Sequence, residues 1–398
     1  MKNLYFKIIL FAKIFFKSKI IFNNPKKSKI VFYDEQWIYL IPKSYKKKSV
    51  ILHTRREVFY FPILLKTLIK FGYKFDEFYY QLEFINHVEP KIVISLFDNF
   101  INFYRLKNYN KKIKFFAVQN GFRNKDLNLK DLTNSSDKIP NKSMLSADLV
   151  FTFNKKIENQ YKKYINCKTM AIGSFKNNFS PRKKTNKIKK SILYISPYRP
   201  YFLGIYKNKN LLKHKDPINK KYPLGLKLKV DFELPININN FCLKNNINLH
   251  IALWATNKLL EKNEIKFYKN ILKGKYKFIR RTNLLSNYKI IDKYDTVACA
   301  YSTLGYEALA RDSKVAFFSP DISRYEKSYN FGWPNSFDKK GFFYSNKYNY
   351  NEVNRVLTNL IGMKDKEWCK KIRNYRDKVM LYDKGNKKLL KSIQTMIR

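Results

Sequence analysis

The segment YSTLGYEALA, residues 301–310, places two hydroxyl side chains, a glycine and a glutamate close together. Ser302 and Thr303 at the start of a helix, with its free backbone N–H groups, could bind phosphate. Gly305 would let a diphosphate approach the backbone closely, and Glu307 could accept hydrogen bonds from two hydroxyls of a ribose or a sugar. The alternative is a capping box, with a hydroxyl as N-cap and Glu307 as its partner. The spacing alone leaves both interpretations open.

Further polar side chains follow two other apolar runs in the second half of the chain. Ser196, Tyr198 and Arg199 come directly after the run SILYI, and Arg324 comes soon after the run VAFF. An arginine at such a place could bind a phosphate through its guanidinium group. The alternative for the first group is a surface turn bounded by two prolines.

The first half of the chain carries amides and arginines at similar places. Amides could bind sugar hydroxyls, and arginines could bind a carboxylate or a phosphate. The residues of this group are Gln119, Asn120, Gly121 and Arg123, together with Asn99, Arg55 and Arg56.

Three carboxylates are candidates for a catalytic base. Sugar transfer with inversion needs one carboxylate or histidine that takes the proton of the acceptor hydroxyl. The candidates are Asp98, Glu57 and Asp34, and the sequence does not rank them. Each could instead cap a helix or form a salt bridge in a loop.

Several other kinds of site find no support in the sequence. There is no P-loop, GxSxG, HExxH or metal-binding DxD motif, so we expect neither a metal nor another cofactor. The charge of a leaving group would then be stabilised by helix dipoles, hydroxyls and basic side chains. The four cysteines are far apart, which argues against a zinc site or a disulfide framework and indicates a reducing compartment.

All these polar groups follow short apolar runs that alternate with helical segments. The predicted strands lie in 29–34, 49–54, 90–98, 112–120, 147–154, 168–174, 191–196, 247–255, 276–281, 296–301 and 314–319. Such alternation predicts parallel, doubly wound sheets, whose ligands bind beyond the carboxyl ends of the strands.

A chain of 398 residues is long enough for two domains, and the charged segment 176–190 is the best linker. The predicted fold is α/β, with two Rossmann-like domains that face a central cleft. The expected boundaries are 1–28 for a basic N-terminal helix, 29–180 and 191–350 for the two domains, and 351–398 for a helical tail. Residues 201–235 are expected to be an irregular insertion.

The formal net charge is +51 at pH 7. Lysines occur in nearly every segment, beside many Asn, Ile, Phe and Tyr residues, which indicates compositional bias rather than a nucleic-acid site. Nucleic acid is therefore not expected as a partner. Residues 1–22 form a basic amphipathic pattern, which could lie on an anionic membrane surface or pack on the protein.

Four segments resemble those of bacterial surface carbohydrate biosynthesis proteins: VQNGFR, GSFKNN, ILYISPYRP and YSTLGYEALA. These proteins look like glycosyltransferases of the GT-B type. The resemblance covers roughly residues 30–350. It implies a nucleotide-sugar donor on the second domain and a glycan or lipid-linked acceptor on the first, without a metal. Ser302, Thr303, Gly305 and Glu307 would then hold the donor.

Two other hypotheses stay open. A sugar-nucleotide epimerase or a polyol-phosphate transferase would use the same fold. A basic nucleic-acid-binding protein without catalytic activity would belong to a different class.

Overall fold

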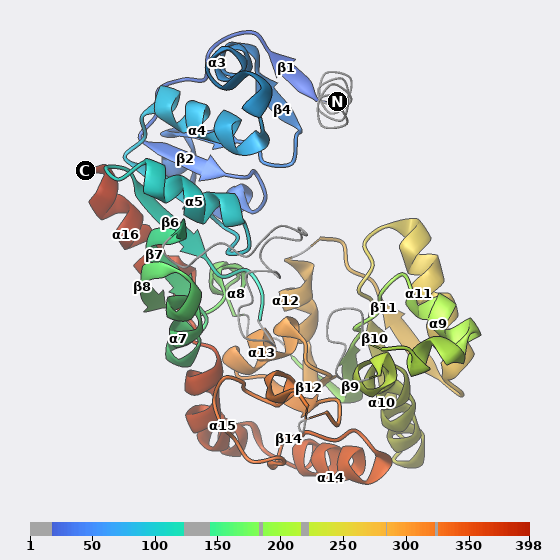
Figure 1. Ribbon diagram of the computed structural model, residues 1–398. Helices are drawn as coiled ribbons and strands as arrows, with labels where there is room; N and C mark the ends of the chain where they lie inside the picture. Colours follow the sequence, from blue (N-terminus) through green and yellow to red (C-terminus); the bar gives the residue numbers. More distant parts are fainter. Residues whose placement is uncertain (1–17, 123–143, 183–185, 216–222, 284, 323–324) are drawn as a thin grey trace. The chain divides into compact units, whose positions relative to one another are not determined.

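The computed structural model describes residues 18–122, 144–182, 186–215, 223–283, 285–322 and 325–398 (Figure 1). The described residues form two compact units. The first unit comprises 18–120, 144–175 and 386–398, and the second comprises 121–122 and the described residues of 176–385. Arg123, Arg324 and the predicted helical residues 1–17 lie outside the described parts of the chain.

The first unit is built on a parallel sheet of six strands. In sheet order these are β3 (Ser49–Leu52), β2 (Ile30–Tyr33), β5 (Ile92–Ser95), β6 (Lys114–Val118), β7 (Ser146–Thr152) and β8 (Asn166–Ala171). β2 and β5 are buried at every residue, as expected for parallel strands covered on both faces. The strand order changes direction between β2 and β5, so their carboxyl ends flank the switch point of this sheet.

Short sequence signals begin and end the helices of this unit. Asp76 caps α4, its Oδ1 accepting from the backbone N–H of Tyr79 at 3.0 Å, and Asn154 caps α7 in the same way. Gly72, at a φ of 49°, ends α3. The helices are η1 (Ile38–Leu40), α2 (Lys43–Lys46), α3 (Phe61–Phe71), η2 (Gly72–Lys74), α4 (Glu77–Val88), α5 (Ile101–Tyr109), α7 (Lys155–Tyr164) and α16 (Lys387–Ile397).

The second unit also contains a parallel sheet of six strands. In sheet order these are β11 (Tyr276–Ile279), β10 (Asn248–Ala252), β9 (Ile188–Ile195), β12 (Tyr294–Cys299), β13 (Lys314–Phe318) and β14 (Tyr344–Ser345). Counted along the chain, this is the Rossmann order 3-2-1-4-5-6. Its switch point lies between β9 and β12, which pair directly, with Tyr194 opposite Ala298.

The chain passes from the first unit to the second within α8 (Phe175–Phe179). The helices of the second unit are α9 (Phe202–Lys207), η4 (Lys209–Lys213), α10 (Leu224–Lys244), α11 (Lys258–Ile271), α12 (Ser286–Ile291), α13 (Thr303–Ala310), η5 (Lys327–Tyr329), α14 (Tyr350–Ile361) and α15 (Asp365–Val379), and η6 (Lys384–Asn386) leads back to the first.

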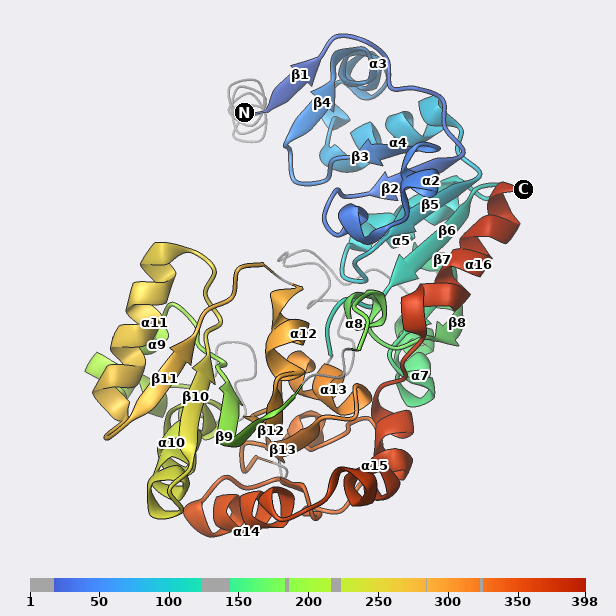
Figure 2. The ribbon, with the colours of Figure 1, turned by 180° about the vertical axis from the view of Figure 1, so that it is seen from behind.

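The last helix of the chain returns to the first unit (Figure 2). α16 buries Leu389, Ile393 and Ile397, which recur every fourth residue and so lie on one face of the helix. The helix contacts β5, and the side chain of Lys29 donates to the backbone oxygen of Ile397 at 3.4 Å. The predicted tail 351–398 is therefore helical, but its last helix belongs with the first unit and α14 and α15 belong with the second.

The prediction of two doubly wound α/β domains is confirmed. That the two sheets face a common cleft stays a prediction. Three local predictions were wrong. Residues 19–21 form strand β1 (Lys19–Ile21), which pairs with β4 (Val58–Tyr60), so the predicted helix 1–28 does not include them. The linker 176–190 contains most of α8 and the start of β9. The insertion 201–235 is largely helical, and α10 continues through Pro235.

Candidate functional site

The switch point of the second sheet brings together two groups of predicted site residues. Ser196 and Arg199 follow β9, and Ser302 and Thr303 follow β12. Because β9 and β12 are neighbouring parallel strands, these residues lie at adjoining carboxyl ends. Ligands of Rossmann-like sheets bind in the crevice at this place. The structure therefore places these residues at one edge of the sheet, where the site stays a prediction, and the individual side chains differ in what they can do there.

Ser302 is the N-cap of α13. Its Oγ accepts a hydrogen bond from the backbone N–H of Leu304 at 3.2 Å. A capping box would need its acidic residue three positions after the cap, which is Gly305, whereas Glu307 lies five positions after it. The capping alternative is thus correct for Ser302, while Glu307 is not its capping-box partner.

Thr303 connects α13 to the segment that follows β6. Its Oγ1 accepts a hydrogen bond from the backbone N–H of Phe122 at 2.9 Å. The ring of Phe122 stacks on Tyr306 with 4.1 Å between ring centroids. Gly121 and Phe122 therefore belong to the second unit, although the sequence placed them in the first. The hydroxyl proton of Thr303 remains available for donation to a ligand oxygen.

Gly305 serves packing rather than clearance for a diphosphate. A Cβ atom at this position would overlap the Sγ of Cys299 and lie 3.0 Å from the ring of Phe317. Both neighbours are buried strand residues, so the missing side chain lets α13 pack closely on β12 and β13. This physical reason replaces the predicted role of Gly305 in ligand binding.

Ser196 and Tyr198 are held inside the second unit. Ser196 Oγ donates to Glu264 Oε1 at 2.5 Å and accepts from Tyr268 Oη at 2.8 Å. Glu264 also accepts from the backbone N–H groups of Trp254 and the next residue, both at 2.9 Å. This network fastens the loop after β10 to the loop after β9. The prediction that Ser196 and Tyr198 contact the donor is not retained, because both side chains are buried.

Arg199 is exposed at the end of β9. Its Nη1 donates to the backbone oxygen of Tyr198 at 2.8 Å, and its guanidinium carbon lies 5.4 Å from the centre of the Trp254 ring. Trp254 follows the neighbouring strand β10. The sequence analysis missed Trp254, although it stands after the run INLHIAL as the other site residues stand after theirs. Together the two side chains offer a cation and a flat ring at one strand edge.

Asp231 is a second residue that the sequence analysis missed. It lies on α10, is 2% exposed, and its Oδ2 accepts from the hydroxyl of Tyr301 at 3.2 Å. Burial raises the pKa of Asp231 to about 7, against the Tyr301 hydrogen bond and the positive charges of Arg199 and Lys227. The only sequence signal was a lone aspartate in the apolar run LKVDFELPI. Tyr301 directly precedes the N-cap of α13, so its hydrogen bond with this buried carboxyl fixes the residue next to the predicted phosphate-binding segment.

Glu307 is 3% exposed on α13. Its backbone oxygen accepts from the side-chain amide of Asn177 at 3.4 Å and from the backbone N–H of Arg311 at 3.1 Å. Its predicted role in binding hydroxyls of the donor stays a prediction.

Asp34 lies at the switch point of the first sheet. Its φ of 85° turns the chain sharply after β2. Its Oδ1 accepts from the backbone N–H of Gln36 at 2.8 Å, and its Oδ2 accepts from Thr54 at 2.8 Å and from Arg55 Nε at 2.9 Å. The Arg55 guanidinium also lies over the ring of Phe97, at 5.5 Å. Asp34 and Arg55 therefore form a fixed ion pair beside the ends of β2 and β5.

Asp98, the second candidate base, has no exposed surface. Its Oδ1 accepts from the backbone N–H of Asn120 at 3.1 Å, and its Oδ2 accepts from the hydroxyl of Tyr161 at 2.5 Å. A base must reach the acceptor hydroxyl, and both oxygens of Asp98 are already bonded to the protein. Asp98 thus joins the ends of β5 and β6 to helix α7.

Gln119 is also an internal connector. It is 1% exposed, and its Oε1 accepts from the backbone N–H of Phe153 at 2.8 Å, which fastens the end of β6 to the end of β7. Gln119 is therefore withdrawn as a ligand for sugar hydroxyls. Asn120 and Asn99 are half-buried at the same edge, and their predicted contact with an acceptor stays a prediction.

Glu57 is the one candidate base that keeps substantial exposed surface. It is half-buried in the loop after β3, and its Oε2 accepts from the backbone N–H of Arg55 at 3.1 Å. Arg56, next to it, has a φ of 66° and pairs with Glu77 at 3.4 Å. Exposure therefore ranks Glu57 first among the three carboxylates.

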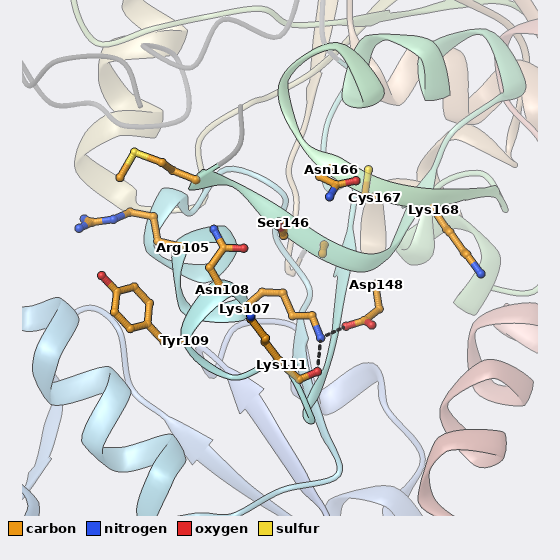
Figure 3. A pocket seen from close by; sticks show the side chains of 12 residues that line it. Arg105, Lys107, Asn108, Tyr109, Lys111, Ser146, Asp148, Asn166, Cys167 and Lys168 are labelled. Atoms are coloured by element: carbon orange, nitrogen blue, oxygen red, sulfur yellow. Dashed lines mark hydrogen bonds and ion pairs between the residues drawn. The ribbon is translucent and has the colours of Figure 1, made fainter. Parts of the chain in front are cut away.

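A cavity of about 820 Å³ in the first unit lies at the amino ends of β7 and β8, opposite the carboxyl ends where the predicted site residues lie (Figure 3). Its lining includes Ser146 and Asn166, where β7 and β8 begin. Lys107 Nζ points to Asp148 Oδ2 at 2.9 Å and donates to the backbone oxygen of Lys111 at 3.1 Å. Among the predicted site residues that the structure describes, none lines this cavity.

Within the described ranges, no group of three or more His, Cys, Asp or Glu side chains could hold a metal ion. Among the helices that the structure describes, none has both the length and the apolar composition needed to cross a bilayer.

A family model described as "putative O-antigen biosynthesis protein" matches residues 116–397. The chain belongs to this O-antigen biosynthesis family. The matched region begins within β6 and includes all of the second sheet and α13. No curated protein matches the sequence.

Solved structures show that this O-antigen family member has a GT-B-like fold. A putative UDP-N-acetylglucosamine 2-epimerase from Listeria monocytogenes is 11% identical, with a TM-score of 0.52, covering 93% of this chain and 96% of that chain. The wall teichoic acid polymerase TagF is 14% identical, with a TM-score of 0.51, covering 94% and 90%. A mutant of S. aureus TarM is 13% identical, with a TM-score of 0.47, covering 81% of this chain but only 59% of TarM.

Proposed function

We propose that the protein is a glycosyltransferase. It would move a sugar from a nucleotide-activated donor to a growing surface polysaccharide or a lipid-linked acceptor, and it would need no metal. Membership of the O-antigen family and the GT-B-like fold support this proposal. The observation that carries it is the switch point of the second sheet, where Arg199 and the N-terminus of α13 lie at adjoining strand ends.

The donor would be held by the second unit. The N-terminus of α13 carries partial positive charge from the helix dipole, which suits a diphosphate, while the N–H groups of Leu304 and Gly305 already donate to Ser302. Thr303 would donate its hydroxyl proton to a phosphate oxygen, and Arg199 would add a full positive charge. Glu307 would accept hydrogen bonds from hydroxyls of the nucleotide sugar. Charge developing on the leaving diphosphate would thus meet fixed donors.

The acceptor would be activated by the first unit. Glu57 is our candidate for the base that takes the proton of the acceptor hydroxyl, because it is the most exposed of the three carboxylates. The fixed pair of Asp34 and Arg55 would hold the loop of Glu57 in place. The acceptor would be reached at the inner face of the cytoplasmic membrane, with the basic residues 1–22 on anionic lipid.

Epimerisation of a sugar nucleotide is the second candidate function. It is favoured by the likeness to the Listeria protein, which covers 96% of that chain. The two functions differ in their products. A transferase releases the nucleoside diphosphate of its donor, or the monophosphate if the donor is a CMP-sugar, when an acceptor is present, whereas an epimerase returns an isomeric nucleotide sugar without any acceptor.

Product analysis tests the proposal. The full chain is incubated with UDP-, GDP-, CMP- and CDP-linked sugars, with and without a lipid-linked glycan extract. Release of free nucleotide that depends on the extract supports the transferase. Conversion of the sugar nucleotide without the extract would replace the transferase by the epimerase.

A further inference from the structure

A second cavity of the second unit has a volume of about 730 Å³ and lies beyond the carboxyl ends of β13 and β14. Asp321 follows β13 and Lys347 follows β14. Four lysines line the cavity, against two carboxylates: Lys229, Lys339, Lys340, Lys347, Asp321 and Glu352.

One of the two carboxylates is already neutralised. Glu352 Oε2 accepts from Arg355 Nη2 at 2.7 Å and from its Nε at 3.2 Å. The Arg355 guanidinium holds the pKa of Glu352 below its ordinary value, and Lys340 adds to this effect. Within the described part of the chain, none of the four lysines forms an ion pair with a carboxylate, so the cavity keeps a net positive charge.

Three of the four lysines, Lys339, Lys340 and Lys347, lie on a turn whose backbone is fixed by hydrogen bonds, and Lys229 lies on α10. The backbone N–H of Asn346 donates to the backbone oxygen of Lys339 at 2.8 Å, and Lys340 and Ser345 pair through their backbones in an isolated antiparallel β-bridge. The backbone N–H of Lys347 donates to Ser345 Oγ at 3.1 Å. A turn held in this way fixes the backbone from which three of the lysine side chains extend.

Arg355 and Gly341 fix the same turn further. Arg355 Nη1 donates to the backbone oxygen of Gly341 at 2.8 Å, which ties the turn to α14. A Cβ atom on Gly341 would overlap the ring of Tyr344, so the turn and the strand pack without space between them. Concave sites lined by charges of one sign concentrate ligands of the opposite sign.

The cavity is separate from the segment proposed to bind the donor diphosphate. Ile322 and Tyr329 form a small apolar cluster, against which Leu226 and Tyr301 pack. Leu226 lines the cavity, while Tyr301 directly precedes Ser302. The cluster thus packs against one lining residue of the lysine cavity and against the residue before the N-cap of α13, and no residue of α13 is among the described residues that line the cavity.

We propose that this lysine cavity binds a phosphate or diphosphate group of a second ligand, distinct from the nucleotide donor. A sugar 1-phosphate and a polyprenyl diphosphate both carry this chemistry. The inference rests on charge and geometry alone and does not need the proposed transfer reaction to be correct.

The test is a titration of the full chain with inorganic pyrophosphate at about 0.15 M salt, with saturating UDP present to occupy the donor segment. The variant Lys339→Ala/Lys340→Ala/Lys347→Ala is compared with Lys262→Ala/Lys266→Ala/Lys269→Ala, which removes the same charge from exposed positions on α11. We expect saturable binding that is weakened about tenfold or more by the first variant only, since each charge-assisted contact is strong. Equal weakening by both variants, or no saturable binding in the presence of UDP, would overturn the proposal.

Two further arms identify the source of the phosphate. Tighter binding of a sugar 1-phosphate than of a short-chain prenyl diphosphate would assign the cavity to a glycan phosphate, and the reverse would assign it to a lipid carrier. If neither competes with pyrophosphate, the cavity has no role in binding a substrate phosphate and the proposal fails.

Discussion

The hydroxyl of Tyr301 donates a hydrogen bond to the Oδ2 atom of Asp231 at 3.2 Å, in a site where Asp231 is almost completely buried. Asp231 lies four residues before Pro235 on α10, and proline has no N–H to offer the backbone oxygen four residues earlier. The helix thus continues although the backbone oxygen of Asp231 receives no hydrogen bond from residue 235. Tyr301 links this carboxyl to the N-cap of α13.

The pair predicts a specific dependence of stability on pH. Because burial raises the pKa of Asp231 to about 7, the folded protein holds this proton more tightly than the unfolded chain does. The stabilisation of the folded protein by this bound proton is complete below about pH 4. It is lost as the pH rises through about 7, by at most about 1.4 kcal/mol per pH unit. The side chain of Asp231→Asn stays neutral at every pH. The free energy of unfolding of this variant should therefore increase relative to that of wild type as the pH rises from 5 to 8. Urea denaturation at four pH values measures this difference.

The control for this experiment is Asp338→Asn, which changes an exposed aspartate of the same unit. Its stability should follow wild type at every pH. Parallel curves for wild type and Asp231→Asn would contradict the raised pKa.

Gly305→Ala should destabilise the protein. The added methyl group would overlap Cys299 Sγ and crowd Phe317, and overpacking of this kind costs about 1–3 kcal/mol. Gly204→Ala is the matched control, because it adds the same methyl group in helix α9, where it meets open space. That control should be neutral or gain up to about 1 kcal/mol. If Gly305→Ala unfolds at the same urea concentration as wild type, the packing role is wrong.

Glu57→Gln should impair turnover and leave the fold intact. Removal of a general base typically lowers the rate by about 10²–10⁴-fold, whereas a surface substitution changes stability by less than about 0.5 kcal/mol. The rate of nucleotide release with acceptor and the urea midpoint together separate the two effects. Full activity of Glu57→Gln would remove Glu57 from the mechanism.

Asp98→Asn should show the opposite pattern to Glu57→Gln in stability. The carboxylate accepts from both Asn120 N–H and Tyr161 Oη, and the loss of a buried charge-assisted bond costs about 1.5–3 kcal/mol. Its urea midpoint should therefore fall clearly. A stable Asp98→Asn protein that has lost turnover would instead restore Asp98 as a candidate base.

Much of the fold could be predicted from the sequence, because buried parallel strands are nearly continuous apolar runs. Strands β2, β5, β9 and β12 all stand out in this way. The two-residue strand β14 and the short strand β1 could not be found, since neither carries enough residues to show a pattern. Residues 201–235 were expected to be an irregular insertion, whereas the structure continues α10 through Pro235 because packing outweighs the lost hydrogen bond.

The edge of the candidate site was predictable, but the task of each side chain was not. Ser196 and Arg199 stand three residues apart after the same strand, yet one is buried and the other is exposed. The difference depends on Glu264 and Tyr268 from α11, which reach Ser196 only in the folded structure. Gly305 likewise has its reason in Cys299 and Phe317, one of which comes earlier in the chain and the other later.

The affinity of the full chain for nucleotide sugars tests the central claim most directly. UDP-, GDP-, CMP- and CDP-linked sugars are titrated against wild type, Arg199→Ala, Glu307→Gln and Arg280→Ala. Arg280 is an exposed arginine just after strand β11, which pairs with β10 and not with the switch-point strands β9 and β12, and it serves as the control. We predict that one nucleotide class binds at one site, that Arg199→Ala and Glu307→Gln weaken it by about tenfold or more, and that Arg280→Ala binds as wild type does. The absence of binding by every nucleotide sugar, or wild-type affinity in both site variants, would contradict the account.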